Sequence, residues 1–305
     1  MNLTFLDQFI QTLARAERQA GRAARLNHGT DYHCLRVKVP RSSSQLRVLA
    51  ILLVYAAMLQ PKALLGETIP VRHTEGLMHG FLVLRSLDGK ALADGQLTQD
   101  AKGDRVTNRL TFRFKDGSTY EETTIFSQRG TFQLVSDHVV QKGPSFKQPT
   151  DTLIDVSTGQ VKVRYTEENK EQNKKKVVAQ RLELPSDVSN GLIFTLMKDL
   201  TPSVPRTTVS LVAATPKPRI VKLAILPQGE EPFTIGSFRH KAVHYIVKVE
   251  IGGLTGFFVR LTGKQPPDTH VWVLGGEAPA FVKAEGPLYA GGPIWRIQLA
   301  SAGLF

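Results

Sequence analysis

From residue 76 onward, hydrophobic and polar side chains alternate in short runs that are separated by turn residues. Leu110, Phe112 and Phe114 alternate with polar residues, and Asp116-Gly117 follows them directly. Successive side chains of a strand point to opposite faces of a sheet, so this run predicts a half-buried strand that enters a tight hairpin. The run over 120–126 is its predicted partner, and its glutamates and threonines suit a solvated sheet face.

The same alternation predicts strands along the rest of the chain. Asp88-Gly89 marks a second hairpin, and the lysine-rich stretch 167–176 is typical of a solvated hairpin tip rather than of a binding patch. The predicted strands span residues 81–85, 91–99, 110–114, 120–126, 132–140, 161–165, 178–184, 208–213, 219–226, 242–251, 254–261, 270–274, 280–283 and 294–299. A sheet of about 12 to 14 antiparallel strands curls into a half-barrel, a barrel or a sandwich.

One segment departs from the period of two. Val188, Leu192, Leu196 and Leu200 recur every four residues, which predicts one amphipathic helix over 187–200. We expect this helix to pack on the sheet and cover its core. The predicted fold class is therefore all-β with one packing helix, in a single antiparallel domain from residue 67 to residue 305.

Residues 48–59 form a strongly apolar stretch, with arginines before it and Gln60-Pro61-Lys62 after it. As a helix it would cover about 18 Å, short of the roughly 30 Å hydrocarbon core of a bilayer. Its length and flanking charge are typical of a secretory signal, so we interpret 46–66 as a signal-like segment. We expect an exported protein of the periplasm or cell envelope, whose membrane contact is limited to 48–59. A buried core helix is the alternative.

Residues 1–45 do not belong to an ordinary signal, because a signal begins close to its charged region. Alternating alanines and arginines over 13–25 predict a basic helix there. A start codon assigned too early explains this extension, and a cytoplasmic segment before an uncleaved anchor is the alternative. The single cysteine, Cys34, lies in it, so a mature chain from residue 67 has no thiol for a disulfide, a metal site or a nucleophile.

The composition is that of a soluble globular protein, with 41% hydrophobic and 22% charged residues among 305. The formal net charge is +12, and half of this excess lies in residues 1–66. The remaining excess is spread thinly along the chain. Nucleic-acid binding needs a clustered basic surface, so we expect no nucleic-acid partner.

Common enzyme motifs are absent from the sequence, including the phosphate-binding loop, the dinucleotide glycine fingerprint, the zincin helix and the nucleophile elbow. His240 and His244 would lie about 13 Å apart on a strand, too far for one metal ion. Asp137 and His138 are adjacent and would point to opposite faces. We therefore expect no cofactor, no metal and no catalytic residue. An enzymatic alternative would need a site assembled from His138, His244, Glu250 and Arg260.

Both tryptophans lie among glycine and proline clusters in the C-terminal third. These clusters predict either tightly packed hairpins or an aromatic-lined mouth for an apolar ligand. For the second case, the predicted ligand-binding residues are Leu192 and Leu196 of the helix together with Trp272 and Trp295.

Three motifs of this region, HYIVKVEIGGLTG, GKQPPDTHVW and EGPLYAGGPIWRIQL, resemble an uncharacterised family of predicted exported bacterial proteins. Asp88-Gly89-Lys90 and the run 112–117 support the resemblance, which covers residues 70–305. A curled sheet with one helix also resembles, in architecture alone, the periplasmic lipoprotein carriers of the Lol pathway. That likeness implies a concave apolar face that could hold an acyl chain.

We accordingly expect an envelope or periplasmic protein that binds a lipid or another apolar ligand without catalysis. A structural or protein-interaction module of the cell envelope is the alternative, and a hydrolase is the third hypothesis. The sequence does not indicate an oligomeric state.

Overall fold

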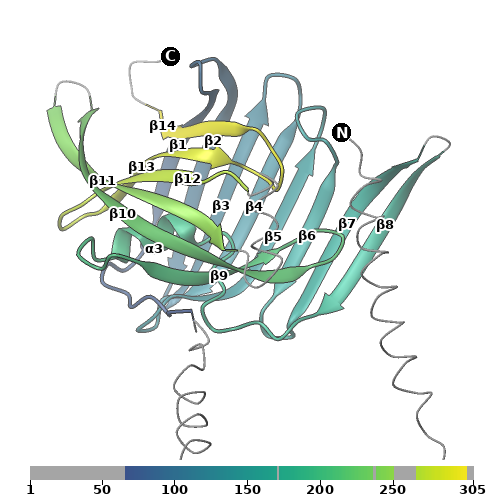
Figure 1. Ribbon diagram of the computed structural model, residues 1–305, viewed down its shortest axis with the longest axis horizontal. Coiled ribbons are helices and arrows are strands. Elements are labelled where there is room, and N and C mark those ends of the chain that lie inside the picture. Colours follow the sequence, from purple (N-terminus) through teal and green to yellow (C-terminus); the bar gives the residue numbers. More distant parts are fainter. Residues whose placement is uncertain (1–65, 170–171, 236–237, 251–265, 301–305) are drawn as a thin grey trace, which may run out of the picture. The chain divides into compact units, whose positions relative to one another are not determined.

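The computed structural model describes residues 66–169, 172–235, 238–250 and 266–300 (Figure 1). These residues belong to one unit of the chain, Ala63–Phe305. The predicted extension 1–45 with Cys34, all but the last residue of the signal-like segment 46–66, the predicted strand 254–261 and Arg260 lie outside the described residues.

One antiparallel sheet contains all the described strands. They are β1 (Met78–Ser86), β2 (Ala91–Lys102), β3 (Arg105–Phe114), β4 (Thr119–Ser127), β5 (Gln133–Lys142), β6 (Thr150–Asp155), β7 (Gln160–Asn169), β8 (Gln172–Arg181), β9 (Thr207–Ala213), β10 (Arg219–Ile235), β11 (Phe238–Glu250), β12 (Thr269–Leu274), β13 (Ala280–Pro287) and β14 (Ile294–Leu299). Their order in the 14-stranded sheet is β8-β7-β6-β5-β4-β3-β2-β1-β14-β13-β12-β11-β10-β9.

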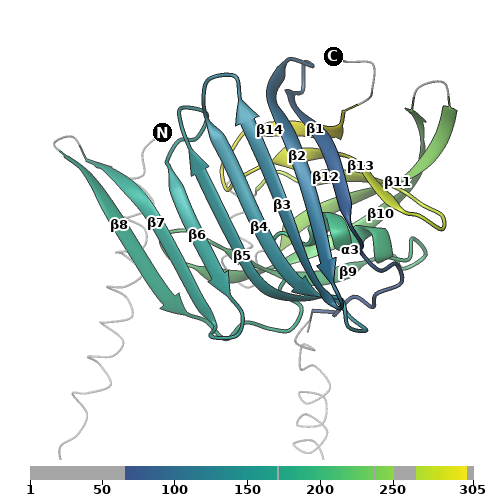
Figure 2. The same cartoon turned by 180° about the vertical axis from the view of Figure 1, so that it is seen from behind.

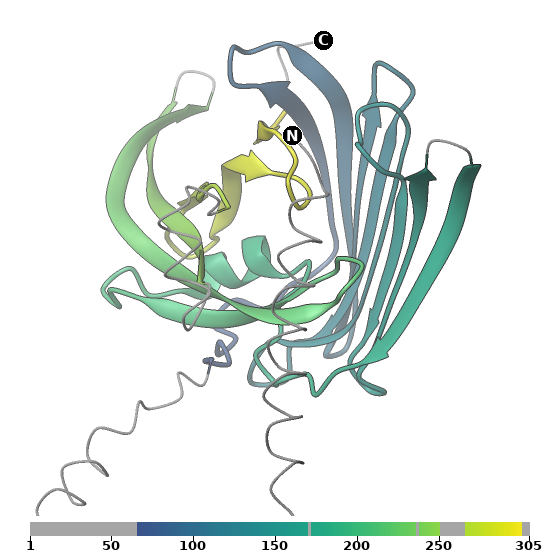
Figure 3. The same cartoon turned by 45° about the vertical axis from the view of Figure 1, so that its right-hand side comes forward.

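Two series of hairpins meet at the centre of this sheet, where β1 pairs with β14. The edges are β8 and β9, which do not pair with each other, so the sheet curls without closing (Figure 3). Figure 2 shows β1 to β8 side by side from behind. The predicted curled antiparallel sheet is confirmed, and its open form corresponds to the half-barrel among the three predicted forms.

The predicted hairpin turns are confirmed at Gly89 and Gly117, whose φ angles of 93° and 85° suit glycine. Strand β6 was not predicted, because its sequence TDTLID contains only two apolar side chains. The hairpin of β7 and β8 is confirmed, but both strands extend into the stretch 167–176 that we predicted as its tip.

Helix α3 (Ile193–Asp199) is the one α-helix of the described residues, and it begins six residues later than the predicted helix over 187–200. Residues 187–190 instead run parallel to β9. The Ser189 amide donates to the Ser210 carbonyl at 2.9 Å, and the Asn190 side chain bonds both backbone groups of Val212 at 2.8 and 3.0 Å. The prediction of a helix at 187–192 is therefore wrong.

The apolar side chains of the predicted helix are nevertheless buried, since Val188, Leu192 and Leu196 are each at most 2% exposed. A turn at Gly191, with φ of 68°, joins the extended segment to the helix. The extended segment and the helix both place these apolar side chains inward. Apolar residues at every fourth position therefore do not distinguish an extended segment from a helix here. No helix among the described residues is both long and apolar enough to span a membrane.

Most of the interior belongs to two groups of buried side chains. The central cluster lies between the two halves of the curl and includes Val106, Phe126, Ile154, Val161, Val163, Val188, Leu192, Leu196, Met197, Val209, Ile225, Tyr245 and Val271. The aromatic cluster comprises Leu82, Leu84, Ala93, Phe112, Phe114, Tyr120, Phe146, Trp295 and Ile297. Helix α3 lies inside the curl (Figure 3), where it contributes to the central cluster.

Candidate functional site

A row of four side chains crosses the inner face of the sheet between the central and aromatic clusters. Leu97 of β2, Leu110 of β3, Glu122 of β4 and Val139 of β5 are consecutive partners across the strands. Alternation places them on the inner face, because the residues two positions away on the same strands are buried. All four are nevertheless only partly buried.

The rows on both sides are buried. Toward the aromatic cluster the row is Gly95, Phe112, Tyr120 and Gln141, and toward the central cluster it is Gln99, Asn108, Thr124 and Asp137. Solvent therefore reaches the middle row but not its neighbours. We call this accessible strip, formed by Leu97, Leu110, Glu122 and Val139, the inner groove.

Two aromatic rings connect the central and the aromatic cluster. Phe194 of α3 and Phe281 of β13 have ring centroids 4.7 Å apart, and each packs against both the central and the aromatic cluster. Both rings are partly exposed. Both rings thus share one packing partner, the aromatic cluster, with the aliphatic residues of the inner groove.

The inner groove contains one ionisable side chain, Glu122, close to a second carboxyl group at Asp137. Burial raises the pKa of Glu122, the nearby Asp137 raises it further, and a hydrogen bond with Tyr120 lowers it. Burial also raises the pKa of Asp137, while the Thr124 hydroxyl, which donates to Asp137 Oδ1 at 2.9 Å, lowers it. We call Glu122 and Asp137 the acid pair. It retains protons at a pH where exposed carboxyls are ionised.

A third polar group lies beside the acid pair. Asn108 is 8% exposed and pairs across the strands with Thr124, which in turn pairs with Asp137. The Oδ1 atom of Asn108 has no hydrogen-bond partner among the described residues. A buried acceptor without a partner costs about 1–3 kcal/mol, so a donor that reached this oxygen would be favoured.

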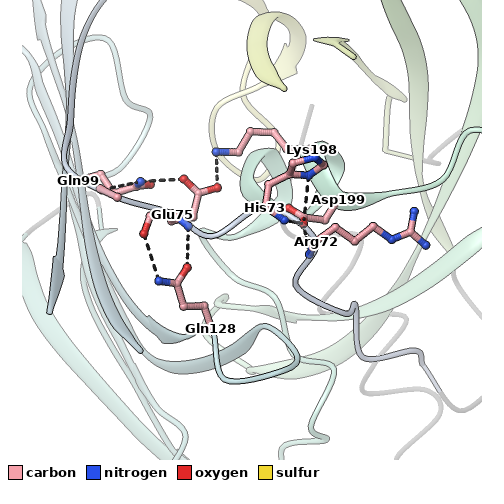
Figure 4. A network of polar contacts seen from close by, with 8 residues as sticks. Arg72, His73, Glu75, Gln99, Gln128, Lys198 and Asp199 are labelled. Atoms are coloured by element: carbon pink, nitrogen blue, oxygen red, sulfur yellow. Dashed lines mark hydrogen bonds and ion pairs between the residues drawn. The ribbon is translucent and has the colours of Figure 1, made fainter. Parts of the chain in front are cut away.

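The C-terminal end of helix α3 is tied to the segment before β1 by a buried polar network (Figure 4). Lys198 forms an ion pair with Glu75. The Gln99 side-chain amide donates to Glu75 Oε2 at 2.7 Å, and Gln128 bonds both backbone groups of Glu75 at 2.7 and 3.1 Å. Through Glu75 and Gln99 the network joins the helix end to strand β2, in the buried row next to the inner groove.

Asp199 makes a second connection at the same helix end. Its Oδ1 accepts the backbone N–H groups of Arg72 at 2.6 Å and His73 at 2.7 Å (Figure 4). Asp199 is 1% exposed, so these charge-assisted bonds form away from water, where they are strong. Together the two connections hold the helix that carries Phe194.

The four predicted ligand-binding residues do not lie together. Leu192 and Leu196 are buried in the central cluster, and Trp295 is buried in the aromatic cluster. Trp272 lies on the outer face, where it packs with Ala242 and Val282. The structure thus brings only the two leucines into one cluster, and a ligand contact of any of the four stays a prediction.

The groove residue Glu122 was missed because we interpreted the run 120–126 as a solvated face. The alternation itself contained the signal, since Tyr120, Glu122, Thr124 and Phe126 share one face. Tyr120 and Phe126 are 5% and 0% exposed, so that face is the inner one. The neighbouring Glu121 points outward and is exposed.

The described residues of the hypothetical catalytic site, His138, His244 and Glu250, also lie apart from one another. The His138 ring bonds Asp151 at 2.9 Å on the outer face, opposite to Asp137, as the alternation predicted. Glu250 forms an ion pair with Arg206 at another part of the sheet. These contacts assemble no shared centre among the described members of that set.

His244 takes part in a polar chain on the outer face. Its Nδ1 lies 2.9 Å from Glu231 Oε1 and its Nε2 lies 2.9 Å from His270 Nδ1. The His244 ring stacks on Trp272 at 4.4 Å, and the Trp272 indole donates to Glu231 at 2.7 Å. Burial lowers the pKa of His244, and Glu231 partly opposes this effect. Within the part of the chain described, no group of His, Cys, Asp or Glu could hold a metal ion.

The described residues define an open, curled antiparallel β protein with a largely apolar inner groove that contains a partly buried carboxyl. No family model matches the chain, and no curated protein matches it. A solved structure of a β-barrel-like protein of the domain of unknown function DUF1849 from Brucella abortus is similar to it, with 10% identity and a TM-score of 0.42. The match covers 75% of this chain and 98% of the other. It does not confirm the resemblance to the Lol carriers.

Proposed function

We propose that the protein binds an apolar or amphiphilic ligand in the inner groove without changing it chemically. The observation that carries this proposal is the partial exposure of Leu97, Leu110 and Val139 between two buried rows. Apolar surface in contact with water costs about 25 cal/mol per Å², and a hydrocarbon chain in the groove would remove that contact. Apolar walls with few polar groups are typical of small-molecule sites.

We further propose that this function is carried out after export, in the periplasm or cell envelope. The support is the signal-like character of residues 46–66. N-terminal sequencing of the protein from its native host tests this part of the proposal. A mature start near residue 67 would agree with export, whereas an intact N-terminus on a cytoplasmic protein would contradict it.

Native mass spectrometry after mild extraction tests the binding itself. We expect an added mass that corresponds to a lipid or another amphiphile, and uptake of a fatty alcohol by the stripped protein. A clean mass without such uptake would contradict the proposal.

A matched pair of variants locates the site. Val139 and Val140 are adjacent on β5 and both partly exposed, but they point to opposite faces. Val139→Trp should fill the inner groove and reduce ligand uptake, whereas Val140→Trp on the outer face should not. Thermal unfolding of both variants shows whether each is folded. Equal uptake by two folded variants would place the ligand elsewhere.

A further inference from the structure

The two edges of the open sheet differ in the hydrogen bonding of their backbones. At the edge formed by β9, other parts of the same chain bond the backbone groups that point away from β10. The carbonyl of Thr208 accepts the amide of Glu67. Both backbone groups of Ser210 and of Val212 bond the segment 187–190. The chain therefore covers this edge of the sheet itself.

The opposite edge of the sheet is β8, the last strand of the row in Figure 2. The amide of Leu182 donates to the carbonyl of Gly159 at 2.9 Å, in the same register as the pairing of β7 with β8. Hydrogen-bonded pairs recur at every second residue of an antiparallel ladder, so the even-numbered residues of β8 bond β7. The odd-numbered residues from Lys175 to Arg181 direct their backbone groups away from β7, and no described residue bonds these groups.

The side chains of these odd-numbered residues are exposed on the outer face, because they alternate with side chains that pair with the buried residues of β7. Lys175 and Arg181 lie at the two ends, and Val177 and Ala179 lie between them. Val177 is 57% exposed. Neither Lys175 nor Arg181 forms an ion pair with a described residue. This stretch of β8, which we call the free edge, thus combines open backbone groups with two positive charges and an exposed apolar side chain.

We propose that the free edge binds an extended acidic segment of a partner protein, which adds a strand to the sheet. The segment would place acidic side chains opposite Lys175 and Arg181, and apolar side chains between them. The proposal is assigned by the juxtaposition of unpaired backbone groups with these two charges and with the exposed Val177. It goes beyond the ligand binding proposed above and does not depend on it.

The charge of the free edge selects this occupant. When a strand is added to a sheet edge, the backbone bonds give affinity and the side chains of alternate residues give specificity. Opposite charges directly across a ladder stabilise the pairing, and like charges destabilise it. Two antiparallel copies of β8 centred on Val178 would place Lys175 of each copy opposite Arg181 of the other. Lysines on an edge oppose such pairing between copies, whereas an acidic segment satisfies both the backbone and the charges.

The test uses a fluorescent peptide, acetyl-Glu-Thr-Val-Thr-Val-Thr-Glu-amide, titrated with the full-length protein and followed by fluorescence anisotropy. Its sequence reads the same in both directions, so it suits a parallel or an antiparallel added strand. A second peptide has lysine in place of both glutamates. A third keeps the glutamates but has N-methyl groups on both valines, which removes two backbone donors. We expect the first peptide to bind at least about 10-fold more tightly than either of the others.

Two variants at one position locate the binding at the free edge. Ala179→Pro removes an N–H group that points away from β7, so the pairing of β7 with β8 is retained while an added strand is blocked. Ala179→Val keeps this N–H group and is the matched control. We expect the proline variant to bind the acidic peptide at least about 10-fold more weakly, and the valine variant to bind it as the wild type does. Thermal unfolding shows whether each variant is folded.

A charge reversal tests the specificity. Lys175→Glu combined with Arg181→Glu should reverse the preference, so that the lysine peptide binds more tightly than the glutamate peptide. Lys217→Glu combined with Arg219→Glu is the matched control, because it reverses two exposed charges beside the covered edge at β9. It should leave the preference unchanged.

Each contrary outcome overturns a stated part of the proposal. Equal binding of the two charged peptides, or an unchanged preference in the charge-reversed protein, would overturn the acidic partner. Equal binding of the N-methylated peptide would overturn strand addition, even if Ala179→Pro failed to fold. A dimer in analytical ultracentrifugation that dissociates in Ala179→Pro would assign the edge to a second copy instead. None of these results changes the expected ligand uptake by the inner groove.

Discussion

Glu122 should make the stability of the protein decrease as the pH rises. Burial raises its pKa from the ordinary value of 4.5 to about 8, so the folded protein retains a proton that the unfolded chain releases. Between these two values the folded state binds more protons than the unfolded state, and the free energy of unfolding therefore falls with increasing pH. This contribution is fully present below the ordinary pKa and is lost once the pH passes the raised value.

The size of this loss follows from the pKa change. A pKa change of one unit between the unfolded and the folded state corresponds to about 1.4 kcal/mol in the free energy of unfolding. Glu122 is partly exposed and shares its protons with Asp137, so the full difference is not reached. We expect the wild-type protein to lose roughly 2–3 kcal/mol between about pH 5 and pH 9 from this site.

Urea unfolding at a series of pH values measures this effect. Glu122→Gln should remove most of the dependence and should be more stable than the wild type at high pH, because a neutral amide takes the place of a partly buried charge. Some dependence should remain, since Asp137 still titrates with a raised pKa. Glu121→Gln should behave as the wild type. Parallel curves for the wild type and Glu122→Gln would refute a raised pKa at this position.

Two further predictions concern the packing beneath the groove. Leu196→Ala should cost about 2–5 kcal/mol, because Leu196 is 2% exposed in the central cluster, whereas Val204→Ala at an exposed position should cost less than about 0.5 kcal/mol by chemical denaturation. Equal losses would show that the helix is not packed in the core. Gly191→Ala should destabilise by more than about 1 kcal/mol, because φ is 68° and the added methyl would overlap the Thr124 hydroxyl. A lower cost, measured in the same way, would mean that the turn at residue 191 can relax.

Much of the secondary structure was predictable because its causes are local. A strand between water and a core needs side chains that alternate in character, and a tight turn needs residues such as Gly89 and Gly117. Strand β6 was not recognisable, since Thr152 is buried there and a threonine does not register as apolar. The start of helix α3 was predicted wrongly because hydrogen bonds to β9, rather than hydrophobic spacing, decide the conformation of residues 187–190.

The sequence by itself determined that Tyr120, Glu122, Thr124 and Phe126 share one face of a strand, because the two-residue repeat of a strand is a property of the backbone. Only the tertiary structure decided that this face is the inner one. Its burial depends on the pairing of β1 with β14, which joins segments more than 200 residues apart, and on helix α3 inside the curl. The same contacts turn Glu122 from an ordinary surface carboxyl into a partly buried acid with a raised pKa, since the pKa depends on what surrounds the side chain in space and not on its neighbours in the chain.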